Sequence, residues 1–391
     1  MEIARQRQFQ WLVQNWEIDR ILLVIGPRQV GKTTLLKQFQ EYLIDRDEST
    51  FFINLENSSY KDLLNKDPEN IFQLVSQPLP GKHITVFIDE IQYLRNPSNV
   101  LKWLYDEYKG RIKLIVSGSS AFYIDQKFTD SLAGRKFIYE MYPLNFSEYL
   151  DFRGRPQPTA VTEATIDKYL PDYYDYITYG GYPEVVLAET PEQKKTILAE
   201  LVNAYTKKDI IDYQLRSADN YVRFMKILSS QIGSLVNLSE ISNTLDVPRS
   251  TLEQYLYVMH KSFHVSLVRP FHQNIRKELS KMPKVYFFDT GLRNFLLGNF
   301  EPFALRIDRG GLLENVFYRQ LLNSVSHHDI RYWRTQNGNE VDFVVQEKMA
   351  YEIKQDIKKF IRKKYKLFTS AYPDITLEPM DLRGCLRGEI G

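Results

Sequence analysis

The sequence predicts an α/β protein whose N-terminal part is a parallel, doubly wound sheet. Four short, mostly apolar runs are expected to form buried strands: residues 21–25, 50–55, 84–88 and 113–116. Helix-forming segments separate these runs, and polar or charged residues follow three of them. In such a sheet a ligand binds at the carboxyl ends of the strands, so these polar residues are the first candidates for a site.

The first apolar run leads into a glycine-containing turn and then a helix. The turn has the spacing G-x-x-x-x-G-K-[ST], in which the glycines let backbone N–H groups wrap a phosphate. The helix N-terminus adds its partial positive charge to the same anion. An ordinary glycine-containing turn is the alternative. The predicted nucleotide-binding residues are Gly26, Pro27, Arg28, Gln29, Val30, Gly31, Lys32, Thr33 and Thr34.

Lys32 is expected to reach the β- and γ-phosphates of ATP, and Thr33 to offer its hydroxyl to Mg²⁺. Asp89 and Glu90 follow the third apolar run. Asp89 is expected to hold the Mg²⁺ shell and Glu90 to polarise the attacking water. An Asp-Glu pair could instead cap the next helix, but its position after a phosphate-binding turn favours a hydrolytic site.

Two further residues are candidates for the same reaction. Ser117 ends the fourth apolar run, and its hydroxyl is expected to help position the hydrolytic water, on a strand between the first and third runs. Arg135 is a candidate arginine finger that would reach the γ-phosphate in a neighbouring subunit, an effect worth roughly 10³–10⁵ in rate where it operates. A surface arginine at the end of a helix is the alternative.

The composition of the chain limits the binding partners and the cellular compartment that we expect. The 391 residues carry a net charge of +2, which is too small to indicate nucleic-acid binding without a local basic surface. The single cysteine, Cys385, makes no internal disulfide and is typical of a reducing cytoplasm. We expect no signal peptide, because polar residues interrupt the N-terminus, and no membrane span.

Several motifs together resemble a known family. The segments GPRQVGKT, VFIDEIQ, VSGSS, LAGR, YPLNFSEYL and Gly180–Glu184 are similar to those of prokaryotic AAA-type P-loop ATPases fused to a C-terminal domain of unknown function. The resemblance extends over almost the whole chain. It implies a cytoplasmic, ATP-hydrolysing homo-oligomer, for example a hexameric ring. It also implies that Gly180 to Pro183 lie where a helical lid meets the nucleotide base.

The sequence pattern in the middle of the chain predicts two further domains. Residues 159–220 are expected to form a helical lid around a break at Gly180. Residues 221–283 have the order of a winged helix-turn-helix, with a short helix capped by Ser239, a second helix begun by Pro248, and a strand.

DNA contacts of the winged helix are expected at the start of its second helix and in its wing. The candidate residues are Arg249, Ser250, Thr251, Arg269, Arg276, Lys277 and Lys281. Winged helices also dock proteins or complete an ATPase lid, so both alternatives stay open.

The C-terminal part, residues 284–391, is expected to fold as a restriction-endonuclease-like α/β domain: helix, hairpin and third strand, basic helix, last strand. Its polar positions resemble the PD-(D/E)xK nuclease signature. They are Glu314, Asp342 and Glu352 as ligands of Mg²⁺, and Lys354 as the residue that positions water or steadies charge. An E-x-K pair on a strand is also common as ordinary alternation, and such domains often bind without cutting.

A basic segment follows this site, and it could bind nucleic-acid backbone. Its residues are Lys358, Lys359, Arg362, Lys363, Lys364 and Lys366. The leading functional prediction is therefore an ATPase, residues 1–158, that drives the binding, remodelling or processing of DNA, with branched DNA such as a Holliday junction as one substrate. The alternative is a nucleotide-driven signalling or scaffold protein whose C-terminal parts bind protein partners.

Overall fold

The computed structural model describes residues 5–78, 83–119, 132–272 and 282–390. The chain forms two compact units: residues 1–142 with 261–263, and residues 143–260 with 264–391. The first unit ends at residue 142, so residues 143–158 of the predicted ATPase core belong to the second unit. The predicted lid, winged helix and C-terminal domain fall mostly within the second unit, and the boundaries between them stay predictions.

The first unit contains a five-stranded parallel sheet in the order β2-β3-β4-β1-β5. Its strands are β1 (Ile21–Ile25), β2 (Thr50–Asn54), β3 (Ile84–Asp89), β4 (Ile112–Gly118) and β5 (Lys136–Glu140). The four predicted strands are confirmed. The sequence analysis missed β5, because this edge strand leaves Phe137 and Ile138 partly exposed and lacks a buried apolar run.

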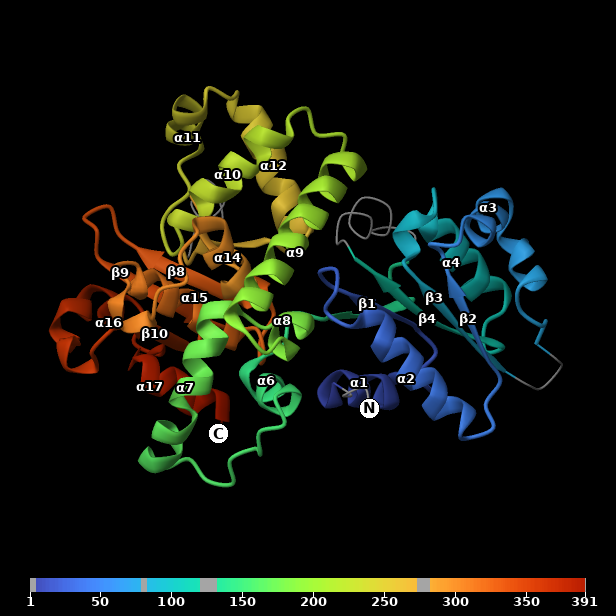
Figure 1. Cartoon of the computed structure of the whole chain (residues 1–391), viewed down its shortest axis with the longest axis horizontal. Coiled ribbons are helices and arrows are strands. Elements are labelled where there is room, and N and C mark those ends of the chain that lie inside the picture. The colour runs from blue at the N-terminus through green and yellow to red at the C-terminus, as the bar shows by residue number, and fades with distance from the viewer. Residues whose placement is uncertain (1–4, 79–82, 120–131, 273–281, 391) are drawn as a thin grey trace. The chain divides into compact units, whose positions relative to one another are not determined.

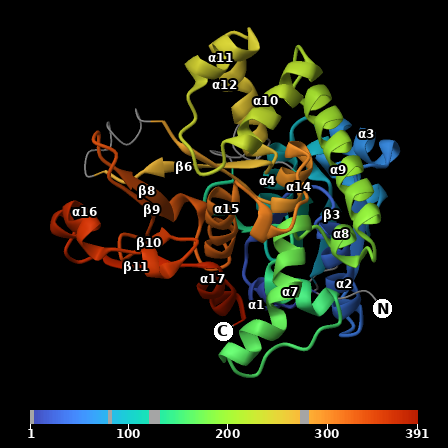
Figure 2. The ribbon, with the colours of Figure 1, turned by 60° about the vertical axis from the view of Figure 1, so that its left-hand side comes forward.

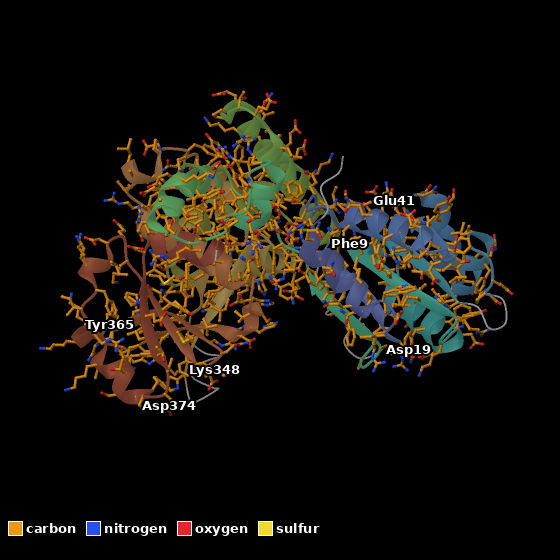
Figure 3. The ribbon with its side chains drawn as sticks, turned by 90° about the horizontal axis from the view of Figure 1, so that it is seen from below. Phe9, Asp19, Glu41, Lys348, Tyr365 and Asp374 are labelled. Carbon is orange, nitrogen blue, oxygen red and sulfur yellow. The ribbon has the colours of Figure 1, made fainter. Side chains whose placement is uncertain are left out.

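Helices cover both faces of this sheet. They are α1 (Gln6–Asn15), α2 (Lys32–Ile44), α3 (Ser58–Lys66) and α4 (Pro97–Glu107), with short 3₁₀ turns η1 (Pro68–Gln73) and η2 (Ile91–Tyr93). The connections β1 to β2 and β3 to β4 run in opposite directions across the sheet, so right-handed crossovers place α2 and α4 on opposite faces (Figure 1). Phe9 of α1 packs against Phe39 and Tyr42 of α2, with ring centroids 5.6 and 5.3 Å apart (Figure 3).

The second unit begins with helices. They are α6 (Phe146–Phe152), α7 (Glu163–Tyr179), α8 (Pro183–Leu187), α9 (Pro191–Asp212), α10 (Ala218–Ser230), α11 (Leu238–Leu245) and α12 (Arg249–Lys261). The predicted break at Gly180 is confirmed. Ser239 does not cap α11: the cap is Asn237, whose side chain accepts a hydrogen bond from the backbone N–H of Glu240 at 3.3 Å.

A six-stranded mixed sheet completes the second unit, in the order β11-β10-β9-β8-β6-β7 (Figure 2). Its strands are β6 (Val265–Pro270), β7 (Lys284–Phe287), β8 (Ile330–Arg334), β9 (Glu340–Val345), β10 (Met349–Ile353) and β11 (Thr376–Met380). β6 pairs with β7 in antiparallel and with β8 in parallel orientation. The strand pair that follows α12 and the C-terminal strands are therefore one continuous sheet.

The remaining helices pack around this sheet. They are α14 (Thr290–Leu297), α15 (Arg309–Leu321), α16 (Lys366–Ala371) and α17 (Leu382–Ile390), with the 3₁₀ turns η3 (Phe303–Leu305), η4 (His327–Asp329), η5 (Ile357–Lys359) and η6 (Arg362–Tyr365). The basic helix predicted after the third strand is wrong as one continuous helix, since two separate 3₁₀ turns precede the short α16. Like charges one helical turn apart, such as Lys359 and Lys363, disfavour a continuous helix.

Candidate active site

The turn predicted to bind phosphate lies between β1 and α2, as expected, and the structure shows why both of its glycines are needed. A Cβ on Gly26 would lie 1.9 Å from the backbone oxygen of Met141, so the chain passes there too closely for any other residue. Gly31 has a φ of +94° immediately before α2, in the left-handed region that glycine adopts without strain. The glycines thus have a packing and a conformational reason within the protein, and their role in wrapping a phosphate stays a prediction.

Lys32 opens α2 and is only 4% exposed. Its Nζ donates to the backbone oxygens of Gly26 at 3.1 Å and Pro27 at 2.7 Å, so the ammonium group bends back over the turn. Burial lowers the pKa of Lys32 to about 8, although the carboxylates of Glu90 and Asp89 act in the opposite direction. The lysine is thus held at the centre of the turn and within the field of both acidic residues.

Asp89 joins the turn to two neighbouring strands. Its Oδ2 accepts a hydrogen bond from the Thr33 hydroxyl at 2.7 Å, and its Oδ1 accepts one from the hydroxyl of Ser117. The backbone N–H of Glu90 donates to the same Ser117 oxygen at 3.1 Å. Because β4 lies between β1 and β3, the expected position of Ser117 is confirmed. Ser117 fixes the Asp89 carboxylate here, while its action on water stays a prediction.

Gln92 is a residue of this group that the sequence analysis missed. Its amide nitrogen donates to Glu90 and, at 2.9 Å, to the hydroxyl of Ser119, while its amide oxygen accepts from the Ser119 N–H at 3.2 Å. Glu90 itself has a φ of +60°, so the chain turns sharply directly after β3. The sequence analysis included Gln92 only as the last residue of the VFIDEIQ segment and gave it no role, because its contacts come from the neighbouring strand end.

Arg135 precedes β5 and forms a two-point contact with Asp106 of α4. Its Nε lies 2.7 Å from Oδ1 and its second guanidinium nitrogen 3.1 Å from Oδ2. Both side chains are partly exposed, so the pair contributes little to stability. The contact with Asp106 supports the alternative that Arg135 is a surface arginine. Its role as an arginine finger stays a prediction.

The second predicted site lies in the second unit, on α15 and the C-terminal sheet. Glu314 accepts a hydrogen bond from the Tyr286 hydroxyl at 3.1 Å, and Asp342 accepts one from the N–H of Ile353 at 2.8 Å. Glu352 lies on β10 and forms an ion pair with Lys354, which follows the end of that strand instead of lying on it as predicted. The structure therefore brings the predicted residues into one neighbourhood.

Burial is the largest single influence on the pKa values of the ionisable groups at this second site. Burial, reinforced by Asp342, raises the pKa of Glu314 well above its usual range and that of Glu352 to about 7. Burial also raises the pKa of Asp342, although Lys284 opposes this. Burial acts to lower the pKa of Lys354, but the hydrogen bond and charge of Glu352, together with Tyr365 and Asp342, raise it to about 12.

Lys284 of β7 is the residue that the sequence analysis missed at this site. Its Nζ lies 3.4 Å from Oδ1 of Asp342 and 3.8 Å from Oε2 of Glu314, and it contacts Glu340. Within the described ranges, no three His, Cys, Asp or Glu side chains are grouped so that they could hold a metal ion. The residues present do not fit the predicted Mg²⁺ site, because a lysine ammonium lies among its carboxylates.

The other predicted contacts are also placed. Arg249 and Ser250 are exposed and Thr251 is half-buried at the start of α12, where Arg249 contacts Glu253 at 3.0 Å. The wing residues Arg276, Lys277 and Lys281 lie outside the described residues.

Gly180 and Gly181 pack closely on Asp289, which precedes α14. A Cβ on Gly180 would be 2.2 Å from Asp289 Oδ1, and the Gly181 N–H donates to Oδ2 at 2.7 Å. This contact lies within the second unit and gives the glycines a packing reason. The expected place of Gly180 to Pro183 beside a nucleotide base stays a prediction.

The turn, the Thr33–Asp89 contact and the parallel sheet together define a P-loop nucleotide-binding domain. Residues 19–150 match a family model described as an AAA domain. Residues 170–302 and 309–381 match two models described as domains of unknown function, DUF8612 and DUF4143. The chain thus carries an AAA-type P-loop domain followed by these two domains.

Two relatives match most of the chain. An uncharacterized protein of Haemophilus influenzae is 27% identical over 373 residues, which cover 90% of this chain and 88% of the relative. An uncharacterized protein of Methanocaldococcus jannaschii is 25% identical over 383 residues, covering 93% and 81%. The architecture is therefore shared between a bacterial and an archaeal protein over nearly its full extent.

The similarity of this chain to solved structures is weaker. Cdc6p from Pyrobaculum aerophilum has a TM-score of 0.33 at 13% identity, covering 75% of this chain and 92% of that one. The replication initiator DnaA bound to AMPPCP and single-stranded DNA also has a TM-score of 0.33 at 13% identity, covering 66% and 89%. Scores this low carry no argument about function.

In the described part of the chain, no helix has both the length and the apolar character needed to cross a membrane.

Proposed function

We propose that the first unit binds ATP with Mg²⁺ and hydrolyses it. The observation that carries the proposal is the hydrogen-bonded series Thr33–Asp89–Ser117, which links the phosphate-binding turn to the ends of β3 and β4. Thr33 and Asp89 offer adjacent oxygen atoms, the ligand type that Mg²⁺ prefers, and both would hold the ion. When bound, Mg²⁺ neutralises charge that develops on the phosphate oxygens.

The residues of this unit then have separate tasks. Lys32 holds the phosphates from the centre of the turn, where little water competes for its charge. Glu90, held by Gln92 and its sharp backbone turn, accepts the proton of the attacking water. Arg135 acts in a neighbouring copy of a homo-oligomeric ring, once its pair with Asp106 is released.

We further propose that the second unit binds DNA and that ATP turnover drives or switches this binding. Exposed basic residues support it, in two places: the start of α12, and the segment of η5, η6 and α16. In the second place the exposed lysines are Lys358, Lys359, Lys363, Lys364 and Lys366. Helices α10 to α12 followed by β6 and β7 are the elements that a winged helix requires. The second unit binds DNA without cutting it, because its described carboxylates do not fit a metal site.

One observation favours a protein partner as the alternative. Ile357, Ile361 and Leu367 are 44%, 49% and 58% exposed among the same lysines. Phosphate backbone offers nothing for aliphatic side chains to contact, whereas an acidic and apolar protein surface does. In this alternative, ATP turnover would switch a signalling or scaffold complex.

A salt titration of DNA binding separates the two functions. Single-stranded, duplex, forked and four-way DNA are compared with and without ATP, and binding to DNA should weaken by orders of magnitude between roughly 50 and 200 mM salt. The double variant Lys363→Gln/Lys364→Gln should reduce the slope of log affinity against log salt by about 2. The control Lys66→Gln/Lys102→Gln removes the same charge from exposed positions in the first unit and should leave the slope unchanged. Equal slopes for the two variants would exclude this segment as a DNA contact.

A further inference from the structure

Lys284 is almost completely buried, with 1% of its surface exposed. It begins β7, and its backbone pairs with Val268 of β6. Its Nζ contacts Glu340 and lies 3.4 Å from Asp342 and 3.8 Å from Glu314. The carboxylates come from α15 and β9, so one ammonium group joins three separate elements.

The charges of this cluster are nearly balanced by the protein itself. Four carboxylates gather there: Glu314, Glu340, Asp342 and Glu352. Three cations oppose them: Lys284, Lys354, which pairs with Glu352, and Arg334, whose guanidinium lies 3.0 Å from Glu340. The formal charge that remains is one negative unit, from four minus three, which is less than a divalent cation would neutralise.

The carboxylate oxygens are also engaged. Glu314 accepts from Tyr286, Asp342 accepts from Ile353, and one oxygen of Glu352 is bonded to Lys354. The second oxygen of Glu352 is buried without a hydrogen-bond partner among the described residues. Mg²⁺ takes six ligands in near-octahedral geometry at about 2.1 Å, and among the described residues these carboxylates are not grouped so that three of them could hold a metal ion.

We propose that the ammonium group of Lys284 holds the place of a divalent cation in the second unit, so that this carboxylate cluster binds no metal. A buried ammonium that bridges three carboxylates offsets part of their charge and fixes their geometry, which is the structural part of what a metal would do. It cannot activate water at a phosphate, because it offers no open coordination position. The cluster is then a structural joint between β7, β9 and α15, and the unit binds its partner without cutting it.

The proposal is tested by binding of Mn²⁺ to the full chain without nucleotide, followed by electron paramagnetic resonance. Wild type and Asp342→Asn should bind the same amount of Mn²⁺, because the cluster contributes no site. Lys284→Met should gain a Mn²⁺ site, and Mn²⁺ should raise its melting temperature. The double variant Lys284→Met/Asp342→Asn should lose both effects.

A matched control is Lys194→Met in the same unit. Lys194 is 4% exposed and pairs with Asp175 at 2.6 Å, so the substitution also removes a buried ammonium, but from a single carboxylate. It should gain no Mn²⁺ site. Binding of Mn²⁺ by wild type that disappears in Asp342→Asn would overturn the proposal, and so would a folded Lys284→Met that gains no site. The comparison of Mn²⁺ binding between wild type and Asp342→Asn tests the proposal even if Lys284→Met does not fold.

Discussion

Replacement of Ser117 by alanine tests whether this hydroxyl acts on Asp89 or on water. The Ser117 side chain is fully buried, donates to Asp89 Oδ1 and accepts from the Glu90 N–H. Alanine removes both bonds and leaves the carboxylate free to rotate away from Thr33. A hydrogen bond to a charged group contributes about 1.5–3 kcal/mol, so we expect kcat/KM for MgATP to fall by roughly 10–150-fold.

The assay is steady-state ATP hydrolysis in a double-mutant cycle with Asp89→Asn. If Ser117 acts by orienting Asp89, the loss caused by Ser117→Ala should shrink to within about threefold in the Asp89→Asn background, since coupled residues are not additive. Nucleotide binding without Mg²⁺ should stay unchanged in Ser117→Ala, because Lys32 and the turn are intact. Full additivity of the two substitutions would refute the orienting role and favour a direct action on water.

Two other predictions follow from close packing. Gly26→Ala should abolish measurable ATP binding, because its Cβ would lie 1.9 Å from the Met141 oxygen, whereas Gly110→Ala, with nothing within 4 Å, should bind normally in the same calorimetric titration. Burial raises the pKa of Asp289 to about 6, so the folded protein holds this proton more tightly than the unfolded chain. The resulting stability is complete below about pH 4 and is lost as the pH rises through about 6, roughly 3 kcal/mol in all. Urea unfolding should show this loss in wild type and not in Asp289→Asn, and the same pH dependence in both would contradict it.

Local sequence was enough for the phosphate-binding turn and the ends of β3 and β4. An apolar run, a glycine pattern and a carboxylate pair each lie within a few residues, so their geometry follows from local chain conformation. The edge strand β5 was missed because Phe137 and Ile138 are not buried. The basic segment was mistaken for a helix, because periodicity alone ignores repulsion between lysines.

The sequence by itself determined that this chain carries a P-loop domain, and it predicts which residues would surround the phosphates. Only the tertiary structure decided what the C-terminal carboxylates contact. Lys284 lies 58 residues from Asp342 along the chain, and no spacing links the two. The sheet that joins β7 to β8 and β9 through β6 brings the lysine to the carboxylates, and its charge changes what they can bind.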